Sequence, residues 1–69
     1  MLLHDLAEAE RHIALGKAEI ADQQALIAEL DLDGHDRWEA LDALAKLRLI
    51  QEAHERRREL ILRAHSAPR

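Results

Sequence analysis

Residues 6–33 divide without remainder into four seven-residue segments, LAEAERH, IALGKAE, IADQQAL and IAELDLD, each beginning with Leu or Ile followed by Ala. A large apolar residue that returns every seven positions lies along one edge of an α-helix and forms a seam for another helix. Three residues after these positions stand Ala9, Gly16, Gln23 and Leu30, so the other side of the seam is partly small or polar. The pattern predicts a first helix over about residues 2–32.

The stretch 31–36, DLDGHD, contains residues that end one helix and begin another. Gly34 is suited to the left-handed conformation that ends many helices, which places a turn at 33–35. Asp36 is suited to the N-cap of a second helix, with Glu39 completing a capping box. No helix breaker occurs over 40–64, so the second helix is predicted over about 36–65, before a short tail at 66–69. Because short connections make neighbouring helices antiparallel, residues 1–69 are predicted to form one all-α, antiparallel two-helix hairpin.

A turn near Gly34 pairs positions on the two helices whose numbers add to about 68. Gly16 then faces Gln51 and Ala9 faces Arg58, so small residues lie opposite long polar ones. Gln23, Gln51 and Arg58 have two open interpretations. They set the register and oligomeric state, or they lie at the edge of the seam and extend into solvent.

Two helices of this length cannot shelter their apolar residues alone. A domain of 69 residues is marginal, and the second helix carries apolar residues on two faces. The simplest closed arrangement is a homodimer in which two hairpins form a four-helix bundle, a coiled-coil-like assembly. The expected oligomer core consists of large aliphatic residues: Leu6, Ile13, Ile20, Ile27, Leu30, Leu44, Leu47, Ile50 and Ile61.

Trp38 is the one aromatic residue, and it has two open interpretations. The first is a packing anchor at the turn, against Leu32. The second is an exposed contact for a helix of another protein, because Trp is over-represented at binding hot spots. In that case the partner face consists of Trp38, Leu49 and Leu60.

Composition narrows the function classes. Without Cys, the chain has no disulfide scaffold, thiolate zinc site or cysteine nucleophile. Ser66 is the single hydroxyl residue and lies in the predicted tail, so nucleophilic and phosphoryl-transfer chemistry have no support and no enzyme activity is expected. The chain has neither a membrane-length apolar run nor a signal-peptide pattern, and a cytoplasmic protein is expected.

Charge is divided between the two halves. Residues 1–34 carry eight acidic and two basic side chains, a net −6, whereas residues 35–69 carry six acidic and eight basic ones, a net +2. Halves of opposite sign favour lying side by side, although exposed ion pairs contribute only about 0–1 kcal/mol each. Charge therefore helps to select a partner and adds little stability.

Five histidines, His4, His12, His35, His54 and His65, are candidate metal ligands. His12 and His54 fall at similar heights in the hairpin, as do His4 and His65. Bundle di-metal sites, however, use Glu-x-x-His motifs, and no Glu here has a His three residues later. The prediction is no metal and no other cofactor, with the histidines filling half-polar helix positions.

The basic residues gather in the second helix, where Arg56, Arg57 and Arg63 are candidate nucleic-acid contacts. Glu52, Glu55 and Glu59 interleave with them, a spacing typical of ion pairs within a helix. No aromatic residues accompany them for base stacking. Solvated or inter-helix ion pairing is therefore the preferred interpretation.

Residues 10–36, ERHIALGKAEIADQQALIAELDLDGHD, resemble a group of short bacterial helical-hairpin proteins of unassigned function. The resemblance rests on Ile13-Ala14-Leu15-Gly16, the Gln23-Gln24 pair and Asp33-Gly34-His35-Asp36. It covers about half of the chain, and Arg37-Trp38 departs from the small polar residue expected after the turn. It implies a helical hairpin and no activity.

These observations favour a non-enzymatic module that associates with itself or docks another protein's helix. The alternative is a small dimeric regulator that binds RNA or DNA through the basic second helix. No membrane partner is expected.

Overall fold

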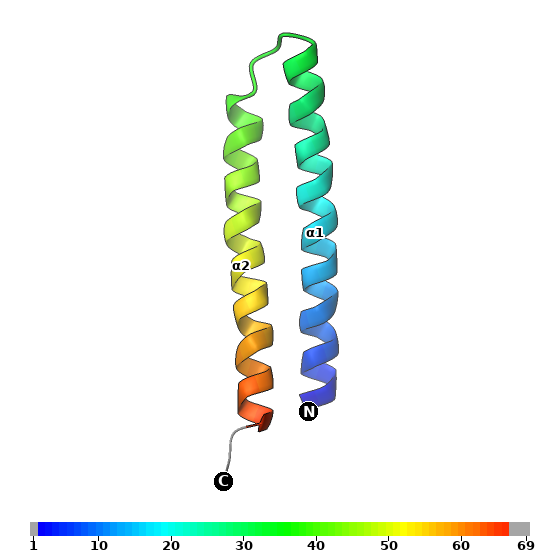
Figure 1. Ribbon diagram of the computed structural model, residues 1–69, viewed down its shortest axis with the longest axis vertical. Helices are drawn as coiled ribbons and strands as arrows, with labels where there is room; N and C mark the ends of the chain where they lie inside the picture. The colour runs from blue at the N-terminus through cyan, green and yellow to red at the C-terminus, as the bar shows by residue number, and fades with distance from the viewer. Residues whose placement is uncertain (1, 67–69) are drawn as a thin grey trace.

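The computed structural model describes residues 2–66, which form two long antiparallel helices joined by one turn (Figure 1). Helix α1 spans Leu2–Leu32 and helix α2 spans Trp38–Ser66. The hairpin measures 58 × 15 × 12 Å, and the first turn of α1 and the last turn of α2 lie at the end opposite the connecting turn. The predicted all-α hairpin is confirmed. Ser66, predicted to begin the tail 66–69, is instead the last residue of α2, and its hydroxyl donates to the Leu62 carbonyl at 2.7 Å. The rest of the predicted tail, 67–69, lies outside the described residues.

Two hydrogen bonds terminate helix α1 just after Leu32, and they require a left-handed backbone conformation at Gly34. Gly34 has a φ of 71°. Its N–H donates to the carbonyl of Asp31 at 3.3 Å, and the His35 N–H donates to the carbonyl of Leu30 at 2.9 Å. This pair of bonds is the Schellman motif, which satisfies carbonyls at the end of a helix. The glycine therefore reverses the chain as predicted.

Helix α2 begins at Trp38, and the Asp36 carboxylate accepts the Trp38 N–H at 3.0 Å. Asp36 thus satisfies one of the free amide groups at the helix start, as expected of a capping residue. Within residues 2–66, Glu39 makes no return bond to the Asp36 backbone, so the predicted capping box is not formed. Arg37 forms an ion pair with Asp31 at 3.1 Å across the turn instead.

The seam between the helices is narrow. Among the described residues, the buried ones are Ala9, Ile13, Ala40 and Gln51. Most of the other large residues at the seam are only half-buried. One hairpin therefore covers a single strip of each helix.

Two glutamines connect the helices in reciprocal fashion. Gln51 of α2 donates from Nε2 to the Ile13 carbonyl of α1 at 2.9 Å. Gln23 of α1 donates from Nε2 to the Ala40 carbonyl of α2, also at 2.9 Å. A shift of one helix along the other by one residue would break both bonds. Of the two open interpretations, the structure favours a role in register for both glutamines.

Within one hairpin, Trp38 is exposed and does not pack against Leu32, the first of its two interpretations. Its side chain is 76% exposed, and Leu32 is also exposed, so the predicted packing between them does not occur. Ala40 faces α1, and a residue two positions earlier lies about 200° further around the helix. Trp38 therefore points away from the seam.

Candidate interaction surface

Two grooves run between the helices, one on each side of the seam, and they differ in chemistry. One groove, which we call the apolar flank, is lined mainly by His12, Leu15, Leu47, Ile50 and His54, with Gly16, Glu19 and Gln51. The other, which we call the charged flank, is lined by Glu10, Lys17, Glu55, Arg58 and Glu59, with the apolar residues Ile13 and Leu62. On α1, Glu10 and His12 lie on opposite sides of Ile13 because each residue advances 100° around the helix.

The apolar flank exposes large aliphatic side chains. Leu15 is 55% exposed and Ile50 is 53% exposed, although both lie beside the seam. Leu26 is exposed as well and lies on the same side of α1, eleven residues and about 16 Å from Leu15 toward the turn. Leu15, Leu47 and Ile50 line one groove, and exposed apolar surface gathered in this way is typical of interaction sites.

Gly16 forms the floor of the apolar flank, where Gln51 packs directly against its backbone. A Cβ added to Gly16 would overlap the end of the Gln51 side chain, with Gln51 Cδ only 2.8 Å away. This is the contact that the hairpin register predicts. Gln51 is 6% exposed, and its Oε1 has no hydrogen-bond partner among the described residues. The close approach of the helices here depends on the missing side chain of Gly16.

His12 and His54 meet in the apolar flank. Their ring centroids are 5.2 Å apart, and the ring planes are inclined by 43°. Both side chains are half-buried, and each comes from a different helix. Of the two histidine pairs that the register allows, the structure brings this one together.

The charged flank is held by an ion pair between the helices. Arg58 of α2 donates to the Glu10 carboxylate of α1, and both side chains are about half exposed. Arg58 was predicted to face Ala9, the neighbour of Glu10. Such exposed pairs are worth about 0–1 kcal/mol. Water solvates the rest of this flank without cost, so it needs no partner.

The residues of the expected oligomer core occupy three environments. Ile13 is buried, Ile50 is exposed, and the remaining residues are half-buried: Leu6, Ile20, Ile27, Leu30, Leu44, Leu47 and Ile61. The expected core thus combines the seam of one hairpin with part of its apolar flank. Leu15 and Leu26 were absent from it because the seven-residue pattern directs attention to the seam; their signal is their eleven-residue spacing.

The predicted partner face of Trp38, Leu49 and Leu60 lies on the outer side of α2, and all three side chains are exposed. Their eleven-residue spacing aligns them along the helix but separates successive members by about 16 Å. Charged residues stand between them. They are isolated apolar points rather than one continuous surface.

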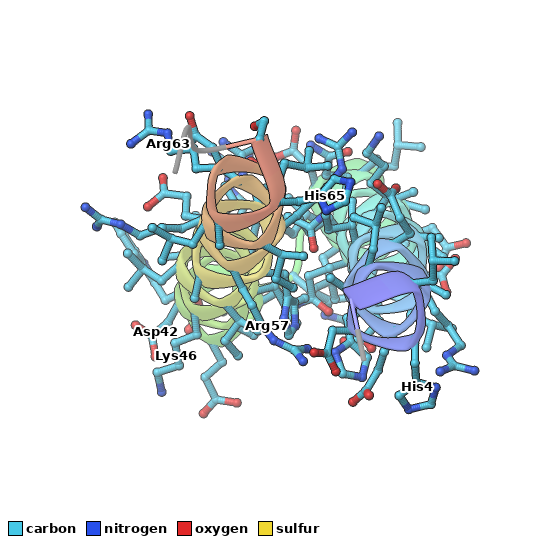
Figure 2. All side chains as sticks on the ribbon, turned by 90° about the horizontal axis from the view of Figure 1, so that it is seen from below. His4, Asp42, Lys46, Arg57, Arg63 and His65 are labelled. Carbon is cyan, nitrogen blue, oxygen red and sulfur yellow. The ribbon has the colours of Figure 1, made fainter. Side chains whose placement is uncertain are left out.

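The predicted nucleic-acid contacts are not gathered on one surface. Arg57 and Arg63 point to different sides of α2 when the hairpin is viewed from its open end (Figure 2). Arg63 pairs with Glu59 at 3.1 Å, and Arg56 lies in a shallow depression with Glu52, Glu55 and Glu59. The carboxylates offset the positive charge that phosphate binding requires.

Two further features concern metals and membranes. Within residues 2–66, no group of three or more His, Cys, Asp or Glu side chains is placed to hold a metal ion. In the same range, neither helix is long and apolar enough to cross a membrane.

Comparison with known proteins gives no match: no family model, no curated protein and no solved structure matches this chain. The function proposed below therefore rests on the residues of the apolar flank.

Proposed function

We propose that this chain is a non-enzymatic self-association module. Two copies pair through their apolar flanks about a two-fold axis, and the two hairpins form a four-helix bundle. The observation that carries this proposal is the exposure of Leu15, Leu26 and Ile50 on one side of the hairpin.

The surface area of the chain supports a second copy as the occupant of this flank. A compact protein of 7.9 kDa exposes about 4,400 Å², whereas this chain exposes 5656 Å². Its radius of gyration is 16.2 Å, against about 11 Å for a compact chain of this length. A dimer of standard size buries about 800 Å² per partner. The excess surface is thus large enough to supply an interface.

The test compares two leucines of similar exposure on different faces. Leu15→Glu places a charge on the apolar flank, and Leu49→Glu places the same charge on the outer side of α2, where Leu49 is 66% exposed. We expect the wild type and Leu49→Glu to sediment as dimers at micromolar concentration and Leu15→Glu to sediment as a monomer. A buried unpaired carboxylate in the interface accounts for the loss.

Two outcomes contradict the proposal. A monomeric wild-type chain that melts cooperatively would show that one hairpin is sufficient. Dissociation by Leu49→Glu and not by Leu15→Glu would move the interface to the face of Trp38, Leu49 and Leu60.

A further inference from the structure

The histidine pair on the apolar flank has the spacing of two ligands on one metal ion. We propose that His12 and His54 are half of a four-histidine site for a divalent transition-metal ion such as Zn²⁺. The same two histidines of a second copy complete the site across the two-fold axis. This inference rests on the proposed dimer and adds a ligand to its interface.

The distance between the two imidazole rings matches that of two ligands on one zinc ion. With zinc–nitrogen bonds of about 2.0–2.1 Å, two imidazoles at the tetrahedral angle hold their ring centroids about 5 Å apart. The centroids of His12 and His54 are 5.2 Å apart, and their planes are inclined rather than stacked. The two rings therefore already have the separation that a shared ion requires.

A single hairpin, over its described residues, provides only two of the four ligands that such a zinc ion needs. Zinc in a structural site takes four ligands, and residues 2–66 of a single chain bring no third His, Asp or Glu to this pair. The pair lies on the flank that the proposed dimer buries. A two-fold axis passing beside it supplies two more imidazoles at once.

The surroundings of the pair suit a bound cation. Glu19 and Gln51 line the same groove, and Gln51 Oε1 has no hydrogen-bond partner in the described part of the chain. Histidines that bind zinc through one nitrogen donate a hydrogen bond through the other, to a carboxylate, carbonyl or water. Imidazole selects Zn²⁺, Ni²⁺ and Cu²⁺ over Mg²⁺ and Ca²⁺, which prefer oxygen ligands.

The experiment titrates the full chain with ZnCl₂ in a calorimeter and repeats the titration with MgCl₂. We expect one zinc ion per two chains and no heat from magnesium. His12→Gln and His54→Gln are each expected to weaken zinc binding at least about tenfold, because half of the ligands are lost from each dimer. The matched controls are His4→Gln on α1 and His65→Gln on α2. Both histidines are exposed, and both variants should bind zinc as the wild type does.

A second measurement covers the case in which a histidine variant fails to fold. In the wild type, zinc should shift the imidazole NMR signals of His12 and His54 and leave those of His4, His35 and His65 in place. Equal binding by wild type and His12→Gln, or shifts at the exposed histidines only, would overturn the site. One zinc ion per chain would overturn its completion by a second copy.

Sedimentation with EDTA separates this inference from the proposed function. A chain that is dimeric in EDTA and, after EDTA is removed, gives no heat on titration with ZnCl₂ removes the metal site and leaves the self-association module intact. A monomer in EDTA that dimerises on addition of zinc removes the purely apolar dimer and supports the metal site.

Discussion

The two flanks of the hairpin differ although they are built from the same two helices. The charged flank meets its own requirements, because Arg58 reaches Glu10 and the other charged groups remain in water. The apolar flank does not, because Leu15 and Ile50 remain more than half exposed. Burying apolar surface stabilises a protein by about 25 cal/mol per Å², and this gain is not realised in one hairpin. The apolar flank therefore has more apolar surface to bury against a partner than the charged flank has.

The difference arises because residues only a few positions apart on one helix point to opposite sides of the seam. Glu10 and His12, two residues apart, enter opposite grooves, as do Ile50 and Glu55 on the other helix. A hairpin can thus keep one side solvated and offer the other for assembly. Under the proposed function, the seam residues fold one hairpin and the apolar flank joins two of them, so the two processes can be separated by mutation.

The largest effect is expected from a charge in the seam that both flanks share. Ile13→Asp places a carboxylate at a buried position, and we expect a loss of about 3–5 kcal/mol. The total stability of a chain of this length is about 3–10 kcal/mol, so the variant should be largely unfolded by circular dichroism. Ala14→Asp, at the exposed neighbouring position, is the control and should melt within a few degrees of the wild type.

The next effect separates the flanks directly. Ile50→Glu should raise the dimer dissociation constant about 100-fold, because a charge is placed in an apolar interface. Lys17→Glu makes a charge change on the charged flank and should leave the constant within about twofold. Sedimentation equilibrium measures both constants at fixed salt. Equal losses from the two variants would show that the flanks do not differ in function.

The effect of Gly16→Ala on the free energy of unfolding should change sign when Gln51 is also replaced by Ala. Gly16→Ala should destabilise the chain by about 1 kcal/mol, because the new Cβ displaces Gln51 and breaks its buried hydrogen bond to Ile13. In a Gln51→Ala background the same change should stabilise by about 1 kcal/mol, because Ala is the better helix former. Urea denaturation at one protein concentration gives the four free energies of unfolding. If Gly16→Ala stabilises the wild type, the close packing described here is absent.

The smallest effect is expected on the charged flank. Glu10→Ala or Arg58→Ala should cost no more than about 1 kcal/mol, because both side chains are about half exposed. The loss should shrink further in 1 M NaCl, where exposed charges are screened. Thermal melts at low and high salt provide the measurement. A larger, salt-independent loss would mean that the pair is buried by a partner.

Much of the fold could be predicted because its signals are local. The Schellman turn follows from Gly34, the start of α2 is close to Asp36, and the contact of Gly16 with Gln51 follows from counting residues outward from the turn. The candidate site was predicted less completely. Ile50 and Leu47 were expected in the oligomer core, whereas Leu15 and Leu26 were not, because they lie away from the seven-residue seam.

By itself, the sequence determined two helices, their turn and their antiparallel register, because periodicity, capping and chain reversal act over a few residues. The tertiary structure decided which side of the pair is apolar, that His12 meets His54, and that Trp38 is exposed. These outcomes depend on how each helix is rotated about its own axis when the two pack. A rotation of one residue's width, 100°, moves a side chain from the seam to a flank, and only the packed pair sets that rotation.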